Sequence, residues 1–224
     1  GGARRCAAQS WSMERIRTVK AATGVTVNDV VLAMCAGALR GYLQEQRALP
    51  ETPLVAMVPV SLRGEHEQDA GGNMVGTILC NLATDTADPL QRLQTISTSM
   101  RDNKRVFSEL PRAQALALSG FLVAGLGLSL VPGFVSSAPP PFNIVISNVP
   151  GAREPRYWNG ARLDGNYPMS IALDGQALNI TLTSYQDQLE FGLIACRRTL
   201  PSMQRLLDYL EQSIRELEIA AGIK

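Results

Sequence analysis

The stretch Phe142-Asn143-Ile144-Val145-Ile146-Ser147-Asn148-Val149-Pro150-Gly151 predicts a buried β-strand that ends in a polar turn. Pro150 and Gly151 are residue types typical of turns. Ser147 lacks the G-x-S-x-G setting of a nucleophilic serine. We therefore expect Ser147 and Asn148 to fix the local backbone or to contact a ligand rather than to attack one.

The single histidine of the chain, His66, lies in a charged segment, Arg63-Gly64-Glu65-His66-Glu67-Gln68-Asp69. A general base needs a positioned partner and a dry pocket. A histidine among so many charges is expected to be solvent-exposed, so we assign it no catalytic role. No paired-histidine centre can be built from these residues. The chain is therefore predicted to carry half of an active site and to need a second half.

Length and composition set broad limits on the fold and the partners. The 224 residues are enough for one large domain or two small ones. A hydrophobic content of 46% with 18% charged residues is typical of a globular protein rather than a disordered one. The net charge of +1 gives no electrostatic signature of nucleic-acid binding.

The four cysteines do not predict a metal site. Cys6, Cys35, Cys80 and Cys196 lie far apart, and none belongs to a C-x-x-C pair. Buried free thiols in a reducing compartment are the simpler interpretation. The chain begins Gly1-Gly2-Ala3-Arg4-Arg5, without methionine or a signal-peptide core. We expect residue 1 to be a boundary, with a longer protein upstream.

Five segments show helical signals. Met13, Ile16 and Val19 recur at helical spacing, and Gly24 supplies a C-terminal cap. Thr26 is a good N-cap, with Asp29 three residues later, where a carboxylate meets free backbone N–H groups. The expected helices are 12–22, 26–47, a helix from 89, 115–131, and a helix from 201.

Six segments predict strands. They are 54–60, 73–82, the strand from 142, 162–172, 177–185 and 189–195, with a loop at 61–72 and short turns at 174–175 and 187–188. Helices on either side of about six strands, with hairpins late in the chain, predict an α/β sandwich with a mixed sheet flanked by helices.

Residues 113–152 contain no charged side chain. The helical part of this stretch is marginal in length for crossing a bilayer and contains three glycines. We favour a core helix or a membrane-surface helix over a membrane span.

Several polar residues are candidates for a site. Asp29 could be a catalytic carboxylate, but its position in the first helical turn favours capping, and Asn28 could bridge to a neighbouring loop. Ser61 and Arg63 follow a strand and could close on an anion, because guanidinium groups suit phosphates and carboxylates. A plain surface turn explains Ser61 and Arg63 equally well.

Five segments together resemble the bacterial wax ester synthase/diacylglycerol acyltransferase family, in the style of actinobacterial triacylglycerol synthases. They occur in the order and spacing of that family over nearly the whole chain. They are Thr26-Val27-Asn28-Asp29-Val30-Val31-Leu32-Ala33, Pro59-Val60-Ser61-Leu62-Arg63, Gly72-Asn73, Ser147-Asn148-Val149-Pro150-Gly151 and Tyr167-Pro168.

The resemblance implies a chloramphenicol-acetyltransferase-like fold, the fold of CoA-dependent acyltransferases, which peptide-synthetase condensation domains share. In it, two α/β subdomains face each other across a tunnel. Residues 1–224 correspond to the C-terminal subdomain. The family's His-His-x-x-x-Asp-Gly motif belongs to the N-terminal subdomain and is absent here. Its second histidine activates the hydroxyl of diacylglycerol or a long-chain alcohol, which then attacks a fatty acyl-CoA thioester.

The resemblance also implies roles for the candidate residues. Tunnel-lining or substrate-contacting positions would be Asn28, Asp29, Ser147, Asn148, Pro150 and Gly151, and coenzyme A contacts would be Ser61 and Arg63. The chain itself would contain no catalytic residue, no metal and no bound cofactor, with acyl-CoA as co-substrate.

The implied partners are the N-terminal subdomain, acyl-CoA, and diacylglycerol or a long-chain alcohol. The implied location is cytoplasmic, peripheral to the inner membrane or to lipid droplets. Two alternatives stay open: a non-catalytic lipid- or partner-binding module on the same fold, and a condensation-type domain that uses carrier-bound acyl groups.

Overall fold

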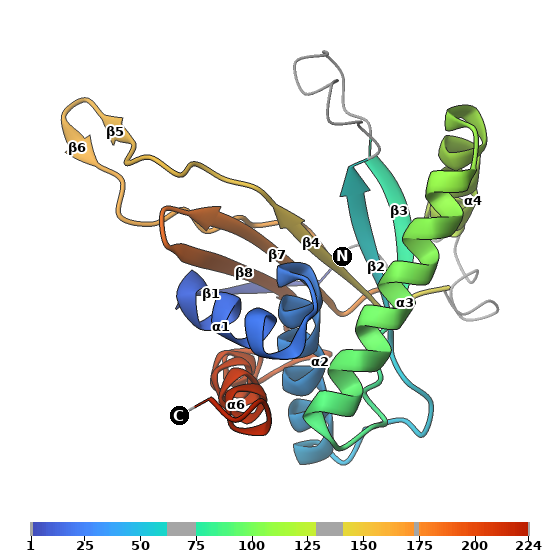
Figure 1. Cartoon of the computed structure of the whole chain (residues 1–224), viewed down its shortest axis with the longest axis horizontal. Helices are drawn as coiled ribbons and strands as arrows, with labels where there is room; N and C mark the ends of the chain where they lie inside the picture. The colour runs from blue at the N-terminus through green and yellow to red at the C-terminus, as the bar shows by residue number, and fades with distance from the viewer. Residues whose placement is uncertain (1, 62–74, 129–140, 173–174, 224) are drawn as a thin grey trace.

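A six-stranded mixed sheet organises the chain, as the sequence predicted. The computed structural model describes residues 2–61, 75–128, 141–172 and 175–223, and its main sheet has the order β1-β8-β7-β4-β2-β3 (Figure 1). A separate two-stranded hairpin is formed by β5 and β6. The strands are β1 (Arg4–Ser12), β2 (Val55–Ser61), β3 (Val75–Asn81), β4 (Ile144–Val149), β5 (Tyr157–Trp158), β6 (Ala161–Arg162), β7 (Leu178–Tyr185) and β8 (Gln188–Cys196).

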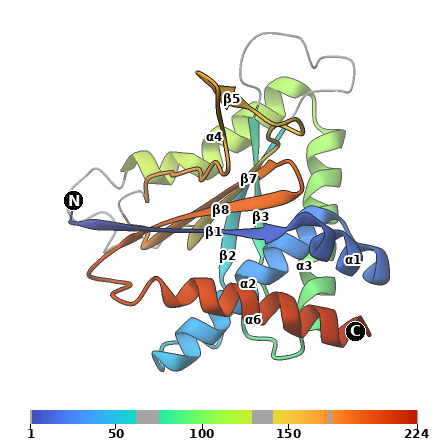
Figure 2. The same cartoon turned by 90° about the vertical axis from the view of Figure 1, so that its left-hand side faces the viewer.

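Helices form a layer on one face of this sheet. They are α1 (Met13–Thr23), α2 (Val27–Glu45), α3 (Pro89–Glu109) and α6 (Arg205–Ala220), and a further helix, α4 (Arg112–Leu128), lies apart from this layer. Helices α2 and α6 pack side by side beneath the sheet, and α3 packs against both α2 and β3 (Figure 2). Helix α4 lies against β3, at the edge of the sheet.

Helix α2 is the centre of the hydrophobic core. Eleven of its residues are buried, and they lie on nearly every side of the helix rather than along one stripe. Its start is fixed by the predicted capping box, in which the Thr26 side chain accepts from the Asp29 N–H and Asp29 accepts from the Thr26 N–H. A cap of this kind contributes about 1 kcal/mol. The prediction that Asp29 caps the helix is confirmed.

Two glycines allow α2 and α6 to approach each other closely. A Cβ at Gly37 would collide with the Ser213 hydroxyl and would lie 3.1 Å from Arg92 Nη2. A Cβ at Gly41 would lie 2.7 Å from the Tyr209 ring. The spacing between the two helices is therefore set by the absence of side chains at these positions.

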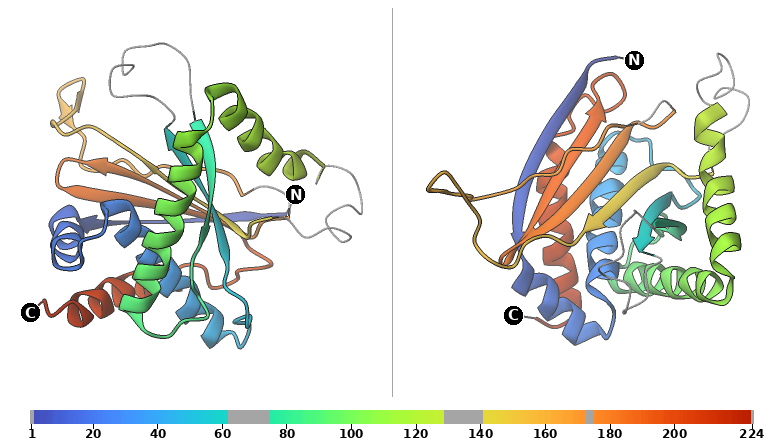
Figure 3. Two further views of the ribbon diagram at one scale, coloured as in Figure 1. Left: turned by 45° about the vertical axis from the view of Figure 1, so that its right-hand side comes forward. Right: turned by 90° about the horizontal axis from the view of Figure 1, so that it is seen from above.

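The sheet divides in its middle. Strands β2, β4 and β7 are parallel, but β2 and β4 pair only at Ala56 with Ile144 and at Met57 with Val145. Beyond these pairs β4 continues along β7 and β2 continues along β3. The two halves of the sheet therefore diverge toward the carboxyl ends of β2 and β4, as the left view of Figure 3 shows.

Most predicted elements are confirmed, with boundaries moved by a few residues. Gly24 ends α1 in a left-handed conformation, with φ of 73°, as its cap role requires. The last helix begins at Arg205 rather than at Pro201, and the β7–β8 turn is Gln186-Asp187 rather than 187–188. The predicted loop at 61–72 lies outside the described residues, except for Ser61, which is the last residue of β2.

The predicted strand at 162–172 is wrong. Only Ala161–Arg162 is extended in a ladder there, and the following residues cross over the sheet instead of joining an edge. Two contacts show the crossing: the Tyr167 hydroxyl lies 3.0 Å from Ser10 Oγ, and a Cβ at Gly192 would collide with the Pro168 carbonyl. Strand β1, which the sequence analysis did not predict, occupies the edge next to β8.

No single helix of the described residues is both long enough and apolar enough to cross a membrane. Only α1 and α2 taken together meet the length and composition criteria, and they are bent by 104° at their junction.

The α2–α6 contact predicts opposite effects for two helical Gly→Ala substitutions. Gly37→Ala should lower the free energy of unfolding by about 1–3 kcal/mol, because the new methyl group overlaps Ser213. Gly120→Ala in α4 is the matched control, since no atom lies within 4 Å of its Cβ position. It should be neutral or should stabilise by up to about 1 kcal/mol. Urea unfolding measures both, and equal stability of the two variants would contradict the close approach.

Candidate functional site

The predicted strand end lies at the mouth of the division in the sheet. Strands β2, β4 and β7 run parallel, so Ser61, Val149 and Tyr185 all finish at the same edge. Ligands of open α/β sheets bind beyond the carboxyl ends of the strands, where neighbouring strands separate. The structure therefore brings Ser61 and the 147–151 segment to the two sides of one opening.

Ser147 and Asn148 face opposite sides of the sheet. Asn148 alternates with the core residues Ile144 and Ile146, so its side chain lies on the helix-covered face. Ser147 pairs in register with Thr181 and lies on the other face. Both side chains are half-buried, and this end of β4 is paired only with β7. The two residues therefore present polar groups to both faces at the same point of the opening.

Gly151 fixes the turn that follows β4. Its N–H donates to Ser184 Oγ at 3.0 Å, and a Cβ there would collide with the Ser184 carbonyl oxygen. The Ala152 carbonyl then accepts from the Gln186 N–H at 2.9 Å. Pro150 is exposed. The turn is thus held against the end of β7, and a residue without a side chain is required at Gly151.

Asn28 and Asp29 lie in the helical layer. Asp29 is almost fully buried, and its Oδ2 accepts from the Thr26 N–H and, at 3.1 Å, from Ser97 Oγ of α3. Its Oδ1 has no hydrogen-bond partner in the described part of the chain. Asn28 is half-buried. These contacts give Asp29 a structural task, joining α2 to α3, and the implied tunnel-lining role of both residues stays a prediction.

Two predicted residues lie outside the described residues. Arg63 and His66 both fall in 62–74, so the coenzyme contact proposed for Arg63 is a prediction only. Ser61 is placed by its backbone, which pairs with Val75 at the end of the β2–β3 ladder. In the described part of the chain, no group of three metal-ligating side chains comes together.

A polar row on the open face of the sheet was missed by the sequence analysis. Register places Val149, Thr183, Glu190 and Ser10 side by side across β4, β7, β8 and β1. Glu190 is 0% exposed, and its Oε2 accepts from Ser10 Oγ at 2.6 Å. Because Ser10 gives its only proton to Glu190, the Tyr167 hydroxyl must donate to Ser10.

The signal for this row is present in the sequence. Strand β7 alternates Leu178, Ile180 and Leu182, which face the helices, with the buried polar residues Asn179, Thr181 and Thr183. An alternation of this kind usually indicates a polar face in water. Here the polar face is buried, in part beneath the segment that carries Tyr167 and Pro168.

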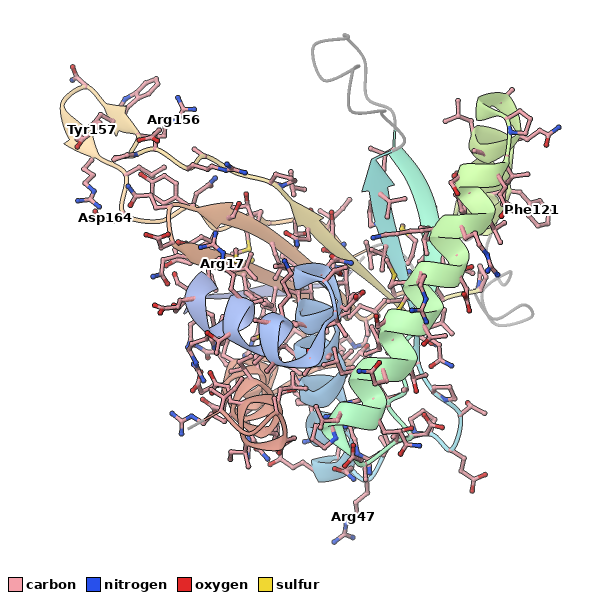
Figure 4. The ribbon with its side chains drawn as sticks, viewed as in Figure 1. Arg17, Arg47, Phe121, Arg156, Tyr157 and Asp164 are labelled. Carbon is pink, nitrogen blue, oxygen red and sulfur yellow. The ribbon has the colours of Figure 1, made fainter. Side chains whose placement is uncertain are left out.

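An arm projects from the sheet beyond the turn. Hairpin β5–β6 reverses at Asn159-Gly160, and Tyr185 holds the base of the arm by accepting from the Arg156 N–H and donating to the Leu163 carbonyl. Figure 4 shows Arg156, Tyr157 and Asp164 at the end of the arm, away from the rest of the chain. Trp158 is 86% exposed and Ile171 is 72% exposed. Exposed apolar patches are typical of surfaces that contact another protein, another domain or a membrane.

Comparison with known proteins assigns the family. A sequence model described as "WS/DGAT C-terminal domain" matches residues 71–218, and one described as "Wax ester synthase/diacylglycerol acyltransferase catalytic domain" matches residues 1–31. The chain belongs to the wax ester synthase/diacylglycerol acyltransferase family. The catalytic-domain match ends within α2, although β1, α1 and α2 are integral parts of the same sheet and helical layer.

Relatives of this family cover the chain from end to end. A probable diacylglycerol O-acyltransferase of Mycobacterium tuberculosis strain H37Rv is 65% identical over 223 residues, covering 100% of the chain and 49% of the relative. The O-acyltransferase WSD of Acinetobacter baylyi is 52% identical over 215 residues, covering 96% of the chain and 46% of the relative. The chain therefore spans about half the length of the curated relatives it matches.

Solved structures confirm the CoA-dependent acyltransferase fold. The wax ester synthase/diacylglycerol acyltransferase from Marinobacter aquaeolei VT8 aligns with a TM-score of 0.87 and 50% identity, covering 99% of this chain and 50% of that one. The first condensation domain of the CDA synthetase aligns with a TM-score of 0.56 and 17% identity, covering 98% of this chain and 46% of that one. The second likeness concerns the fold alone.

Proposed function

We propose that this chain is the C-terminal half of an O-acyltransferase. The enzyme transfers a fatty acyl group from acyl-CoA to diacylglycerol or to a long-chain alcohol and makes triacylglycerol or wax ester. The family assignment and the names of the relatives support the activity. The general-base histidine is supplied by an N-terminal half, because the only histidine here lies in a charged segment without a second histidine.

The observation that carries this proposal is the divided sheet with its uncovered apolar border. Large apolar side chains are exposed at the end of β4, on the arm and along the segment that crosses the sheet: Val149, Tyr157, Trp158, Leu163, Tyr167, Met169 and Ile171. A second half of similar size would cover them and close the opening into a tunnel. The half-length matches to relatives support the same arrangement.

Within this arrangement the polar strand end orients the substrates. Ser147 and Asn148 offer hydroxyl and amide groups at the end of an apolar strand, which suits the ester and hydroxyl groups at the reacting end of two lipids. Acyl-CoA is the co-substrate. The Ser61 edge and Arg63 are the proposed contacts for its phosphates, because guanidinium groups bind phosphates in bidentate fashion.

Acyl transfer by reconstituted halves tests the proposal. Palmitoyl-CoA would be supplied with diacylglycerol or with hexadecanol, and free coenzyme A would be measured with this chain alone, with its N-terminal half alone, and with the two together. Transfer should appear only when both halves are present, because the base and the strand end then meet.

Either other outcome contradicts the proposal. Transfer by this chain alone would show that the base lies within it. No transfer by the two folded halves together would favour a lipid- or partner-binding module instead. A preference for acyl groups on a carrier protein over acyl-CoA would favour a condensation-type domain.

Asn148→Ala should lower the turnover number, because the activation free energy should rise by about 1–3 kcal/mol. That is the usual cost of losing one polar contact to reacting groups. The melting temperature should change little, since Asn148 is only half-buried at the end of its strand. Asn143→Ala is the control, because Asn143 accepts from the Val55 N–H at 2.8 Å and serves the sheet. Unchanged turnover in Asn148→Ala would remove it from the site.

We infer that the enzyme works in the cytoplasm at the surface of the inner membrane or of lipid droplets. Helix α4 supports this location, because Leu116 is 43% exposed and Phe121 is 78% exposed, and Figure 4 shows Phe121 on the outside of the chain. Flotation of the full-length enzyme with triacylglycerol droplets measures the association. Phe121→Ser should weaken it, whereas the control Val106→Ser on α3 should not; equal flotation of the two variants would contradict the location.

A further inference from the structure

A pocket lies in the helical layer, on the opposite side of the sheet from Ser147. It has a volume of about 230 Å³ and forms where the second half of α2, the start of α3 and α6 meet (Figures 1 and 2). The lining residues that decide its chemistry are Gly37, Arg40, Gln44, Arg92, Ser213 and Glu216. None of them belongs to the strand end or to the polar row described above.

Arg92 is the unusual member of this lining. The residue is 1% exposed, and its Nη1 donates to the carbonyl oxygens of Thr86 at 2.9 Å and Ala87 at 3.3 Å. Among the described residues, its Nε has no hydrogen-bond partner. Burial lowers the pKa of Arg92, while Glu216 and Asp88 raise it and Arg40 lowers it. A buried guanidinium is costly unless an anion and further hydrogen bonds compensate for the lost water.

Arg40 brings a second guanidinium to the same pocket. Its Nη1 donates to the Thr84 carbonyl at 2.6 Å. Within the described part of the chain, neither Arg40 nor Arg92 forms an ion pair with a carboxylate. Each guanidinium carries five N–H donors, so both retain donors beyond those used on the loop carbonyls.

The pocket carries an excess of positive charge. Glu216 is its one acidic lining residue, and that carboxylate accepts from Gln212 Nε2 at 2.8 Å. Glu45 is nearby on α2, but it pairs with Arg205 and accepts from the Tyr209 hydroxyl. Two guanidinium groups of the lining therefore face one lining carboxylate that is already hydrogen-bonded. Asp88 also acts on Arg92 from outside the lining, and its carboxylate accepts from the Gln91 N–H at 2.7 Å.

Size and charge together select the kind of ligand. Drug-sized ligands occupy pockets of about 300–1,000 Å³, and a water molecule takes about 30 Å³ of liquid, so this space suits a small ion rather than an acyl chain. A ligand with one carboxylate group would bring the total charge of Arg40, Arg92, Glu216 and ligand to zero. A doubly charged tetrahedral oxyanion can accept from both guanidinium groups, and its charge exceeds that of the single lining carboxylate, Glu216.

We propose that the pocket between α2, α3 and α6 is a phosphoryl-binding site held by Arg40 and Arg92. It is separate from the acyl-transfer site, and its ligand is either a soluble phosphate compound or the headgroup of a phosphomonoester lipid. A ligand there would clamp the start of α3 to α2 and α6, because both arginines already hold the carbonyls of residues 84–87.

Titration of the full-length protein with inorganic phosphate tests the site. Binding would be followed by ³¹P NMR line broadening at constant ionic strength. Arg40→Gln removes a half-exposed donor, and Gln44→Glu places a negative charge on the exposed wall of the pocket. Each should weaken phosphate binding by about tenfold, the effect of one charge at close range near a protein surface. Glu216→Gln should strengthen binding by a similar factor.

The control is Gln188→Glu, which makes the same charge change at an exposed position at the start of β8, outside the pocket. It should leave phosphate affinity unchanged. Far-ultraviolet circular dichroism and thermal melting establish that the variants fold. The proposal is overturned if the folded wild-type protein binds no phosphate, or if Gln44→Glu and Gln188→Glu change the affinity equally.

Vesicles distinguish the two sources of the phosphoryl group. Vesicles of phosphatidylcholine and phosphatidate in equal parts should displace bound phosphate if a lipid headgroup reaches the pocket, whereas vesicles of phosphatidylcholine alone should not. Phosphate that stays bound in the presence of both vesicle types would identify the ligand as a soluble compound. These readings do not depend on acyl transfer, so they stand or fall separately from the proposed activity.

Discussion

The burial of α2 on almost every side is the constraint on which the rest of the structure depends. A helix with no solvent-exposed face must pair the free N–H and C=O groups of its ends with protein groups, and it must pack closely against the elements around it. Asp29 does this at the N-terminus through the capping box and through Ser97 of α3. Gly37 and Gly41 do it along the helix by letting α6 approach. Helices α1, α3 and α6 are all positioned against α2, and the sheet closes the remaining side.

The division of the sheet reflects the helices that pack against each of its two halves. Strands β7, β8 and β1 lie over α2 and α6, whereas β3, the partner of β2, packs against α3 and α4 at the other edge. The ladder between β2 and β4 has two residue pairs, preceded by the hydrogen bonds between Asn143 and Val55. The carboxyl ends of the parallel strands can therefore separate without unpairing any other ladder. The two strands are thus joined at the base of the division and separate toward their carboxyl ends.

Sequence patterns predicted the elements whose signals are local. Thr26 and Asp29 gave the start of α2, Gly24 gave the end of α1, and the apolar run before Ser147 gave β4 and its turn. Strand β1 was missed because an edge strand needs few apolar residues, and its fully buried side chains are Ala7 and Trp11. The predicted strand at 162–172 was wrong because the apolar residues of this segment do not belong to a ladder. Some pack on the sheet, and others are exposed to solvent.

Sequence patterns could not predict the contacts that depend on the register between neighbouring strands. Glu190 lies in an apolar strand, where a charged residue normally indicates the solvent side. Only the pairing of β8 with β1 and β7 places it between Ser10 and Thr183, where it is fully buried. The same holds for Arg40 and Arg92, which are 52 positions apart on two helices and meet only because α2 crosses the start of α3. The exposed apolar side chains lie on the arm and on the segment that crosses the open face of the sheet, whereas the two guanidinium groups lie in the helical layer on the other face. Because the sheet stands between them, a phosphoryl group held by Arg40 and Arg92 would be kept apart from acyl chains on the open face.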